Sequence, residues 1–524
     1  MVETVTGTNR SAGVSYNEVL DRDSHPVRDI LRVDNPLPPG PTVVDPKVYY
    51  SRDVFEQEKE RLWKRVWQMA CHEDDIPNLG DAIVYDIADL SFIVVRSGED
   101  EFHAFPNACL HRGRQILHQN EEGLHNLRCA FHGWSWGLDG ELQEVPCHWD
   151  FPTVSKETHS LKQVKVGRWG GFVFINPDPD CAPLEDFLGN LDEHMTLLPM
   201  ERRYKAVHVA KRLPCNWKVA HEAFAEAYHS VATHPTLLST LGCANSKYDI
   251  FGNFSRALSA HHVGSPHVPS WLAEHPYMEA TPFTKQRHEL TGSIYERVEE
   301  GRVKVTTTDN RVGYFDDRGN HVDGEKFHAD IHLCNWVGGR LVDGMDELPS
   351  SVMTGDFAEK RAKAASVRRE ELRKILGDKM DEVSDAELLD PIYYSLFPNV
   401  SPWGSFNQIF YRFRPYGDNP EECIHECLFM WPVPEGQPRP PAAKMQWLDL
   451  DDDYVDAPEL GHLAKVFNQD TLNLPYVQKG LHSLDEVIFA NYGETKPRHF
   501  HMLYNEWMAM GRARQSEIAE SSAG

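Results

Sequence analysis

The sequence lacks the long apolar runs of a membrane protein: no stretch approaches the roughly 20 consecutive apolar residues that a membrane-spanning helix needs. Its first ten residues, Met1 to Arg10, also lack the basic and apolar regions of a secretory signal. No glycine-rich phosphate loop follows a strand-like segment, which argues against a nucleotide site. We therefore expect a cytoplasmic protein without a membrane segment.

Basic residues are scarce relative to acidic ones. Lys and Arg total 53 against 80 Asp and Glu, which gives a formal net charge of −27. A surface this acidic argues against binding to nucleic acid or anionic lipid, although much of the acidity can simply aid solubility. Cysteine is sparse as well, with 10 in 524 residues, too few for a disulfide scaffold. In a reducing compartment, closely spaced Cys and His residues are better explained as metal ligands.

The chain divides by composition into three parts. Residues 1–47 are polar and proline-rich and predict an extended N-terminal segment. Residues 48–175 begin with a helix over 51–69 and continue as short apolar strands with glycine-rich turns, which is typical of a small β domain. Residues 176–524 mix helices and strands irregularly, with a highly charged helix over 358–380.

Two short loops in the β domain each carry one cysteine and one histidine. The first, Cys109-Leu-His111, has the form C-x-H. The second, Cys129-Ala-Phe-His132, begins 18 residues after His111 and has the form C-x-x-H. Thiolates and imidazoles bind both iron and zinc, so residue type alone does not choose the metal. Structural zinc fingers usually offer two cysteines together and then two histidines, whereas here each loop supplies one of each.

This order suits a two-iron cluster in which the cysteines hold one iron and the histidines hold the other. Two neutral imidazoles in place of thiolates raise the reduction potential to roughly −150 to +300 mV, from about −400 mV for plant-type clusters. Such a centre can accept electrons from an ordinary ferredoxin. A zinc site, or four unrelated residues, are the alternatives. The pairs Cys71-His72 and Cys147-His148 have no matching second loop, and we interpret them as ordinary residues.

A second group of candidate ligands accompanies a predicted helix over residues 216–229. At about 100° per residue, Trp217 and two further aromatic side chains form one stripe. Glu226, at about 180° from Trp217, and His229, at about 120°, point together and away from that stripe. The aromatic face anchors the helix, so the acid and the imidazole face something else.

His234 would lie too far around a continuous helix to share a metal with His229. Pro235 disfavours helical geometry at the preceding residue, so the helix should loosen and let both imidazoles meet. Two histidines and one carboxylate with open positions form the facial triad of non-haem Fe(II) oxygenases. Composition alone cannot choose the carboxylate among 80 acidic residues, and two surface histidines without a metal are the alternative.

Together these residues resemble the large catalytic subunit of the Rieske non-haem iron aromatic ring-hydroxylating oxygenases. The resemblance covers most of the chain: the two Cys/His loops, N-W-K with E-x-Y-H-x-x-x-x-H near the middle, and Q-D with V-Q-x-G-L near the end. It implies four ligands for one [2Fe–2S] cluster: Cys109, His111, Cys129 and His132. It implies three ligands for one mononuclear Fe(II): His229, His234 and Asp470.

The resemblance also implies an α+β fold with two domains. A small all-β Rieske domain with its preceding helix would occupy residues 48–175, and a catalytic domain residues 176–524. In the catalytic domain, an antiparallel sheet would wrap around a long helix in a helix-grip arrangement, with the substrate pocket between them. Relatives are commonly trimers, α3 or α3β3, in which the cluster of one subunit feeds the iron of its neighbour across an acidic bridge. We expect a homotrimer.

The sequence departs from this family pattern at three places. Glu226 stands at the bridge position, where most relatives have Asp, so the bridge has one more methylene. Ala223 stands where relatives usually carry an Asn near the iron. The chain is also longer than many relatives, and the surplus falls within 240–390, which we interpret as an insertion near the pocket and its entrance.

The implied function is that of a terminal oxygenase component. A separate NAD(P)H-dependent reductase would pass single electrons, directly or through a ferredoxin, to the cluster, and onward by way of His132, Glu226 and His229. One or both atoms of O2 would then enter an aromatic or other hydrophobic cyclic substrate. Oxidative demethylation or C–N cleavage, as in relatives that act on quaternary ammonium compounds, is the alternative within the family. A Rieske electron carrier without oxygenase activity and a zinc-binding interaction module are alternatives from other classes.

Overall fold

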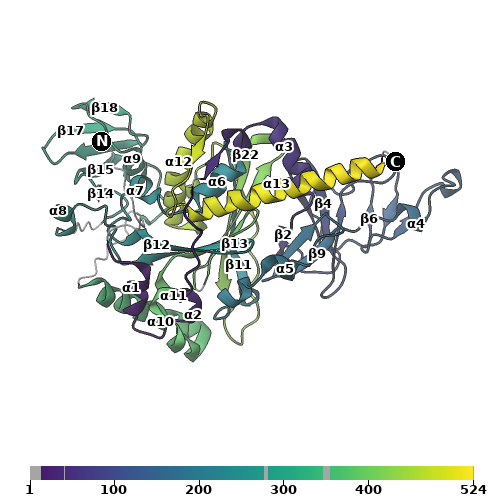
Figure 1. Ribbon diagram of the computed structural model, residues 1–524, viewed down its shortest axis with the longest axis horizontal. Helices are drawn as coiled ribbons and strands as arrows, with labels where there is room; N and C mark the ends of the chain where they lie inside the picture. The colour runs from purple at the N-terminus through teal and green to yellow at the C-terminus, as the bar shows by residue number, and fades with distance from the viewer. Residues whose placement is uncertain (1–12, 41, 276–280, 346–354, 405, 523–524) are drawn as a thin grey trace.

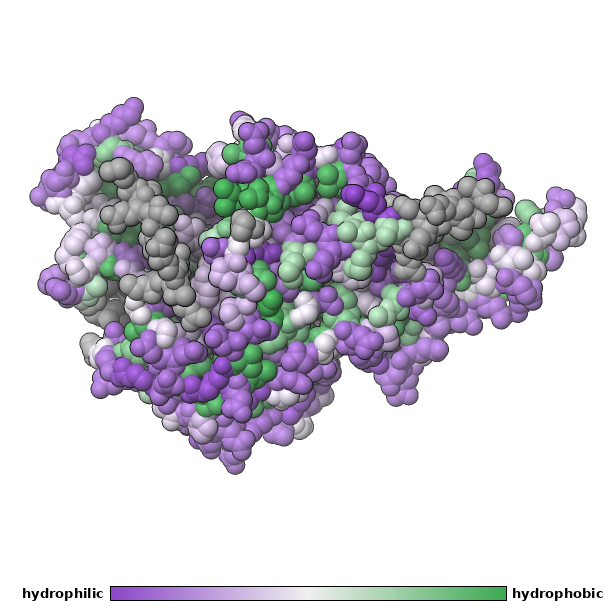
Figure 2. All heavy atoms as spheres, in the orientation of Figure 1, coloured by the Kyte–Doolittle hydropathy of each residue, from purple (hydrophilic) through white to green (hydrophobic). Residues whose placement is uncertain are grey.

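The computed structural model describes residues 13–40, 42–275, 281–345, 355–404 and 406–522. The molecule is elongated: three small sheets lie toward one end, a large sheet lies in the middle, and a further sheet lies at the other end (Figure 1). Hydrophilic residues cover most of the face in view, and hydrophobic side chains gather near its middle (Figure 2). Among the helices of the described ranges, none is both long and apolar enough to cross a bilayer.

Residues 68–176 form the small β region that the sequence predicts. Strand β10 pairs with both β2 and β9, so the two ends of this region meet in one sheet. The apolar run of β10 is buried at every position because it is the central strand. The strands, sheet by sheet, are β2 (Gln68–His72), β10 (Phe172–Asn176) and β9 (Lys165–Trp169); β3 (Ala82–Ile87), β4 (Leu90–Arg96) and β5 (Phe102–Pro106); β6 (Leu127–Arg128), β7 (Ser135–Trp136) and β8 (Leu142–Glu144).

The large sheet has eight strands in the order β12-β13-β19-β20-β21-β22-β11-β23. All neighbours are antiparallel except β11 and β23, which confirms the expected α+β fold with a largely antiparallel sheet. In chain order the strands are β11 (Arg203–Leu213), β12 (Leu241–Phe251), β13 (Phe254–His261), β19 (Ile392–Leu396), β20 (Val400–Pro402), β21 (Ile409–Tyr416), β22 (Asn419–Pro432) and β23 (Gln446–Leu448).

Two long helices accompany this sheet. Helix α12 (Leu463–Leu481) lies beside the short helix α6 (Trp217–Ala223), and α13 (Thr495–Ser522) runs along the molecule toward the small sheets (Figure 1). Phe500 of α13 packs edge-on against Trp217 of α6, with ring centroids 5.7 Å apart. Short strands β1 (Val43–Val44) and β24 (Val487–Ile488) pair with each other. The remaining short helices are α1 (Tyr16–Asp21), α2 (Asp29–Arg32), α4 (Lys156–His159), α5 (Leu184–Leu188) and α8 (Ser270–Ala273).

The N-terminal segment differs from the extended chain that its composition predicts. Helices α1 and α2 lie within it, because Ser15 forms a capping box at the start of α1 and overrides the polar, proline-rich character of the segment. The Asp23 carboxylate accepts hydrogen bonds from the backbone N–H groups of Asp385 and Ala386, each at 2.9 Å. The segment is therefore docked against the start of α11 (Asp385–Leu389).

The helix predicted over 51–69 is also shorter than expected. It consists of α3 (Arg52–Glu58) followed by one π-helical turn over Lys59–Trp63. Strand β2 begins at Gln68, where the chain pairs with β10 at the edge of that sheet. All five residues of β2 are buried. The apolar residues Val66 and Trp67, which suggested a longer helix, therefore lie between the π-helical turn and β2.

Region 240–390 holds more than one structural part. It begins with β12 and β13 of the large sheet and ends with the charged helix α10 (Phe357–Leu376) and with α11. Between them lies an antiparallel sheet of five short strands with helix α9 (Ile331–Gly338) packed on it. We call this sheet and α9 the distal unit; its strands are β14 (Lys285–Arg287), β15 (Ile294–Glu299), β16 (Arg302–Thr306), β17 (Val312–Phe315) and β18 (His321–Gly324). That this region is an insertion stays a prediction.

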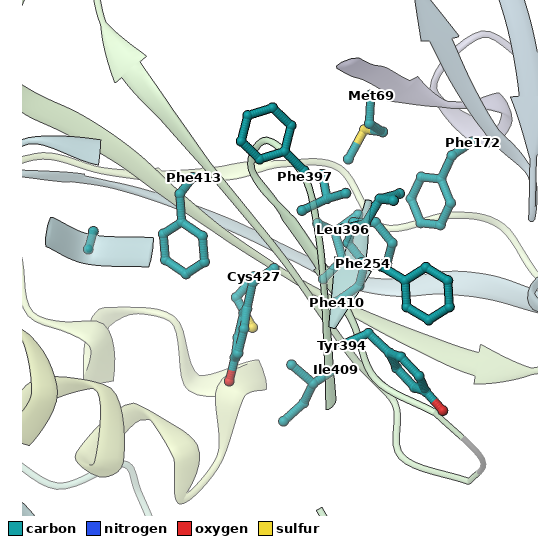
Figure 3. Close-up of a cluster of buried hydrophobic side chains, with 14 of the residues drawn as sticks. Met69, Phe172, Phe254, Tyr394, Leu396, Phe397, Ile409, Phe410, Phe413 and Cys427 are labelled. Atoms are coloured by element: carbon teal, nitrogen blue, oxygen red, sulfur yellow. The ribbon is translucent and has the colours of Figure 1, made fainter. Parts of the chain in front are cut away.

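The hydrophobic core runs without a break from the small β region into the large sheet (Figure 3). Phe172 of β10 stacks on Phe410 of β21, with ring centroids 4.2 Å apart. Met69 of β2 lies in the same cluster and is 2% exposed. The part of the β region around β2 and β10 therefore shares its core with the large sheet, whereas Cys109 and Cys129 lie in a second hydrophobic cluster.

A buried ion-pair network crosses the same junction. Arg412 of β21 donates to both carboxylate oxygens of Glu426 at 2.8 and 2.6 Å, and to the backbone carbonyls of Met69 and Ala70 at 2.7 and 2.9 Å. Burial alone would raise the pKa of Glu426, but the guanidinium groups of Arg412 and Arg414 hold it well below its usual value. The pair stays charged and joins the β region to the sheet.

Replacing Arg412 with methionine should lower the free energy of unfolding by about 3 kcal/mol, because the buried Glu426 carboxylate would lose the closer of its two guanidinium partners. Urea unfolding followed by circular dichroism measures this loss. The control is Arg52→Met, which breaks an ion pair with Asp418 whose two side chains are 49% and 60% exposed. The free energy of unfolding of that variant should fall by about 1 kcal/mol or less. Equal losses in both variants would contradict the assigned role of the junction.

Candidate active site

The two Cys/His loops are built alike despite their different spacing. The Gly113 N–H donates to the Cys109 carbonyl at 2.8 Å, and the Gly133 N–H donates to the Cys129 carbonyl at 3.0 Å. Each cysteine N–H donates to the carbonyl five residues further on, at 2.8 and 2.9 Å. Gly113 and Gly133 have φ of +76° and +79°, a left-handed conformation that explains the glycine in each motif. The loops therefore present two matching pairs of side chains.

The four side chains divide into a buried and a more exposed half. Cys109 and Cys129 are 4% and 1% exposed, whereas His111 is half-buried and His132 is exposed. The Nδ1 atoms of the two imidazoles lie 3.1 Å apart. A buried cysteine pair beside a more exposed histidine pair fits a [2Fe–2S] cluster whose two irons have different ligands.

The helix predicted over 216–229 ends early. Helix α6 covers only Trp217–Ala223, and its first turn is capped by the Asn216 side chain. The helical-wheel argument that placed Glu226 beside His229 is therefore wrong in its geometry. The two side chains meet all the same, because the turn after α6 brings them together three residues apart: Glu226 Oε1 lies 2.7 Å from His229 Nδ1.

Three candidate iron ligands converge from two elements. His229 and His234 flank the short helix α7 (Ser230–Thr233), and the chain leaves helical geometry at His234, with φ −122° and ψ 60°. Asp470 belongs to α12, and its Oδ1 lies 3.4 Å from His229 Nε2 and 2.8 Å from His234 Nε2. In the described ranges, this is the set of His, Cys, Asp and Glu side chains whose ligand atoms all lie within 4.8 Å of one another.

This donor set fits a mononuclear iron(II), since two imidazoles and one carboxylate leave further coordination positions open. His234 and Asp470 are nearly buried, at 4% and 7% side-chain exposure, while His229 is 27% exposed. The four Cys/His loop side chains do not converge in this way, as the ligands of a single tetrahedral zinc ion would. The two groups are therefore suited to different metal centres.

The charges at the triad favour a positive charge between the carboxylates. Burial alone would lower the pKa of His229, but Glu226 and Asp470 raise it well above its usual value. Burial alone would raise the pKa of Asp470, but His234 and His229 hold it well below its usual range. A proton or a metal cation can supply the positive charge that Asp470 and Glu226 both face.

A cavity of about 460 Å³ opens beside the triad, which forms part of its wall. Most of the other lining residues are apolar, and three aromatic rings form a connected group. Tyr393 and Trp403 stack with centroids 5.2 Å apart, and Trp403 and Tyr411 meet edge-on at 5.9 Å. Cavities of this size and character bind small organic molecules.

Two residues, one in this wall and one beside Asp470, bear on the sequence predictions. Ala223 lines the cavity, so a methyl group stands at the position where the resemblance led us to expect an amide. Gln469, next to Asp470, is completely buried and contacts His234, a role that sequence reasoning missed. The Q-D pair of the C-terminal motif was the signal that could have indicated it.

Glu494 lies close to the carboxylates of this region. Burial raises its pKa to about 7, and the negative charges of Glu226 and Glu222 add to the effect. Its carboxylate accepts a hydrogen bond from the Ala490 N–H at 2.5 Å, which opposes the rise only in part. Between the ordinary glutamate pKa of 4.5 and this value, the folded protein holds a proton that the unfolded chain has lost. The free energy of unfolding must therefore fall as pH rises through this window.

Glu494→Gln should accordingly stabilise the protein at pH 8 and have little effect at pH 5. We expect a gain of about 1 kcal/mol at pH 8, after allowance for the partial exposure of the group. Thermal unfolding at the two pH values measures the difference. The amide keeps an acceptor for the Ala490 N–H, so the comparison isolates the charge. A gain of the same size at both pH values would contradict the assignment.

Profiles of two protein families match the chain. The Rieske [2Fe-2S] domain matches residues 66–155. The ring hydroxylating alpha subunit (catalytic domain) matches residues 198–315 and 320–510, more than half of the chain. The first match contains both Cys/His loops, and the second contains the His229, His234 and Asp470 triad.

Individual relatives align over part of their length. The biphenyl 2,3-dioxygenase subunit alpha of Rhodococcus jostii (strain RHA1) is 33% identical over 196 residues, 36% of this chain and 43% of that protein. The glycine betaine monooxygenase oxygenase subunit of Pseudomonas aeruginosa (strain UCBPP-PA14) is 31% identical over 193 residues, 37% of this chain and 45% of that protein. The matched part thus spans less than half the length of these two curated relatives.

Solved structures resemble the whole fold. A quaternary ammonium Rieske monooxygenase has a TM-score of 0.54 at 16% identity, covering 91% of this chain and 100% of its own. Naphthalene 1,2-dioxygenase from Rhodococcus sp. has a TM-score of 0.52 at 16% identity, covering 89% of this chain and 94% of its own. At these identities the likeness concerns the fold. Together with the two profile matches, it shows that the chain belongs to the Rieske ring-hydroxylating oxygenase alpha-subunit family, whose two domains indicate a [2Fe–2S] cluster and a mononuclear iron site.

Proposed function

We propose that this protein is the terminal oxygenase component of a multicomponent system. It would take electrons from a separate NAD(P)H-dependent reductase, directly or through a ferredoxin, and use O2 to hydroxylate or dihydroxylate an aromatic or other hydrophobic cyclic substrate. The observation that carries this proposal is that His229, His234 and Asp470 line a 460 Å³ cavity with largely apolar walls. A substrate in that cavity would lie directly against the triad.

The proposed cluster ligands are the four side chains of the two Cys/His loops, Cys109, His111, Cys129 and His132. The proposed iron ligands are His229, His234 and Asp470. When bound, the cluster supplies single electrons and the iron supplies the site of O2 activation. Asp470 brings a negative charge to the two imidazoles, and the apolar wall keeps bulk water from the substrate. His132 is an exposed ligand of the cluster site, and we propose that electrons leave the cluster through it toward Glu226.

Glu226 is proposed to orient His229 and to link it to a neighbouring copy of the chain. Its Oε1 accepts from His229 Nδ1 at 2.7 Å, and its Oε2 accepts from the His229 backbone N–H at 3.0 Å. These two bonds hold the ring so that Nε2 faces Asp470. A carboxylate between two imidazoles can fix both rings and stabilise positive charge.

A homotrimer is the assembly that we propose, with α3β3 as the alternative. In one chain the loops around β6 lie toward one end, and α7 lies toward the other (Figure 1). Phe131 of the second Cys/His loop is 56% exposed, and Trp149, in the 3-10 turn His148–Asp150 of the same β region, is 81% exposed. Tyr228 beside His229 is 61% exposed. Exposed aromatic groups at both sites suit contacts between copies, which would bring one chain's cluster near the next chain's triad.

The charges of the cavity support a neutral hydrophobic substrate. Its three carboxylates are each paired: Glu226 with His229, Asp470 with His234, and Asp390 with Arg361 at 2.6 Å. A cationic substrate would therefore find no carboxylate among the described lining residues without a partner. The ring group of Tyr393, Trp403 and Tyr411 nevertheless favours a second candidate, oxidative demethylation or C–N cleavage of a quaternary ammonium compound by cation–π binding.

A product analysis tests the proposal and separates the two candidates. The protein, with iron and sulfide content measured and its cluster checked by EPR, is incubated with NADH, a surrogate reductase and ferredoxin, and ¹⁸O₂. Biphenyl and naphthalene are compared with glycine betaine and carnitine. A labelled diol or monohydroxylated ring supports the proposal, whereas formaldehyde or a released amine supports the second candidate. No O2-dependent product from either group, with both iron centres intact, would contradict both.

A further inference from the structure

We propose that Gln469 is a positioning residue for the imidazole of His234, and that the distal unit holds it in place. The inference rests on the proposed function, because it takes His234 as an iron ligand. Gln469 precedes Asp470 on α12 and is completely buried, so its amide must find its partners inside the protein. It has two, which come from different parts of the chain.

The chemistry of these partners fixes the orientation of the amide. Gln469 Nε2 lies 3.0 Å from the backbone carbonyl of His332, which can only accept a hydrogen bond, so the NH2 group must face it. Gln469 Oε1 then faces His234 Nδ1 at 2.9 Å. An oxygen acceptor at this place keeps the proton of the imidazole on Nδ1. Nε2 is left free of a proton and faces Asp470, as a metal-binding nitrogen must.

The other side of this amide belongs to the distal unit. His332 lies on α9, and its Nε2 is 3.1 Å from Asn473 Oδ1, one turn beyond Gln469 on α12. Asn473 Nδ2 lies 3.2 Å from the Gln469 carbonyl, so its Oδ1 is the atom turned to His332. Lys465 of α12 donates to two backbone carbonyls at the end of α9 and just beyond it, at 2.9 and 3.0 Å. Helix α9 therefore contacts α12, the helix that carries Asp470, at three successive turns.

Helix α9 is itself tied to the five-stranded sheet. Asp330 caps its first turn, and the Asp330 N–H donates to the Tyr295 hydroxyl of β15 at 2.8 Å. Trp336 stacks on Phe283 with centroids 5.3 Å apart, and its ring also lines the cavity. One helix thus supplies a wall of the cavity and the carbonyl that orients Gln469. The distal unit therefore stabilises the orientation of Gln469 beside the proposed iron ligand His234.

Gln469→Leu should weaken metal binding at the triad by about 10- to 100-fold, the usual cost of removing the partner of a metal-ligating histidine. Leucine offers no acceptor, so His234 is free to adopt the tautomer that carries its proton on Nε2. Gln469→Glu keeps an oxygen acceptor toward His234. In this buried position the acid is expected to be protonated, so that its O–H can still donate to the His332 carbonyl, and the variant should stay within about threefold of the wild-type affinity. The two variants separate the hydrogen bond from the mere filling of space.

The measurement is a titration of protein depleted of iron at the triad with Co(II) alone, followed by its visible absorption, and repeated with Fe(II) without oxygen. The Rieske EPR signal serves as an internal check on the rest of the molecule. The matched control is Gln478→Leu, on the same helix and 4% exposed, whose amide bonds Asn216, Tyr49 and Glu421 but no candidate ligand. It should lose thermal stability without losing metal affinity.

The outcomes distinguish the inference from the function on which it rests. If the wild-type protein keeps its cluster but binds no metal at the triad, the proposed function fails. If the wild type binds and Gln469→Leu binds equally well, only the inference fails. It also fails if Gln478→Leu weakens binding as much, or if Gln469→Glu weakens it as much as leucine does. Should the leucine variant not fold, the glutamate variant alone must still bind like the wild type.

Discussion

Replacing Glu226 with glutamine will lower turnover with the native electron donor by about 10- to 100-fold or more, while both metal centres stay in place. Glutamine has the same length, and its one carbonyl oxygen can still accept from His229 Nδ1, while its NH2 group takes the place of the oxygen that accepts from the His229 backbone N–H. What it lacks is the negative charge that raises the pKa of His229 and that stabilises positive charge between two imidazoles. The loss should fall on turnover and not on metal content.

Iron and sulfide analysis, the Rieske EPR signal and steady-state turnover measure this result. The matched control is Glu222→Gln, also near the end of α6, whose carboxylate contacts Tyr49 and His501 but not His229. That variant should keep most of the activity. Near-normal turnover in Glu226→Gln would refute the bridge, and equal losses in both variants would assign the effect to local structure.

Asp470→Ala should remove the iron at the triad and lower activity by more than about 100-fold. Mutating a residue that only hydrogen-bonds a metal ligand already lowers metal affinity or activity by about 10- to 100-fold, and Asp470 is itself a proposed ligand. Asp470 is the carboxylate that both imidazoles face, at 2.8 and 3.4 Å. Without it, two neutral imidazoles remain, which bind iron(II) weakly. The cluster lies in another part of the chain and should be unaffected.

Iron content is expected to fall by one atom per chain while the Rieske EPR signal stays at its wild-type intensity. The control is Asp453→Ala, an acidic residue that bonds Asn468 of the same helix and has no contact with the triad. That variant should retain its iron. Full iron occupancy in Asp470→Ala would overturn the assignment of this residue, and the loss of both centres would show a general folding defect instead.

The cluster loops show how far sequence reasoning reaches. Cys109 and His111 lie two residues apart, so their proximity follows from the chain itself, and the glycine of each motif indicates the turn that exposes them. The family can also be predicted from these local motifs, and both profile matches confirm that prediction. The roles of the individual ligands and the domain boundaries remain predictions, and the Asp470 variant tests one of those roles.

The helix over 216–229 shows where such reasoning failed. The periodicity is compatible with a longer helix, yet α6 stops at Ala223. The turn that follows places Glu226 beside His229, which a continuous helix was not needed to do. The conclusion that the two side chains point together was right for the wrong geometric reason. A pattern of 3.6 residues cannot report a helix end that tertiary contacts impose.

By itself, then, the sequence indicated which residues are candidate metal ligands, because the spacing of Cys109 and His111, of Cys129 and His132, and of His229 and His234 is local. Only the tertiary structure decided what surrounds that chemistry. Asp470 meets His234 across 236 positions, and Gln469 joins the same imidazole to α9. The cavity is likewise lined from segments between residues 223 and 470. Contacts at such separations follow from how the elements pack, and no local pattern encodes them.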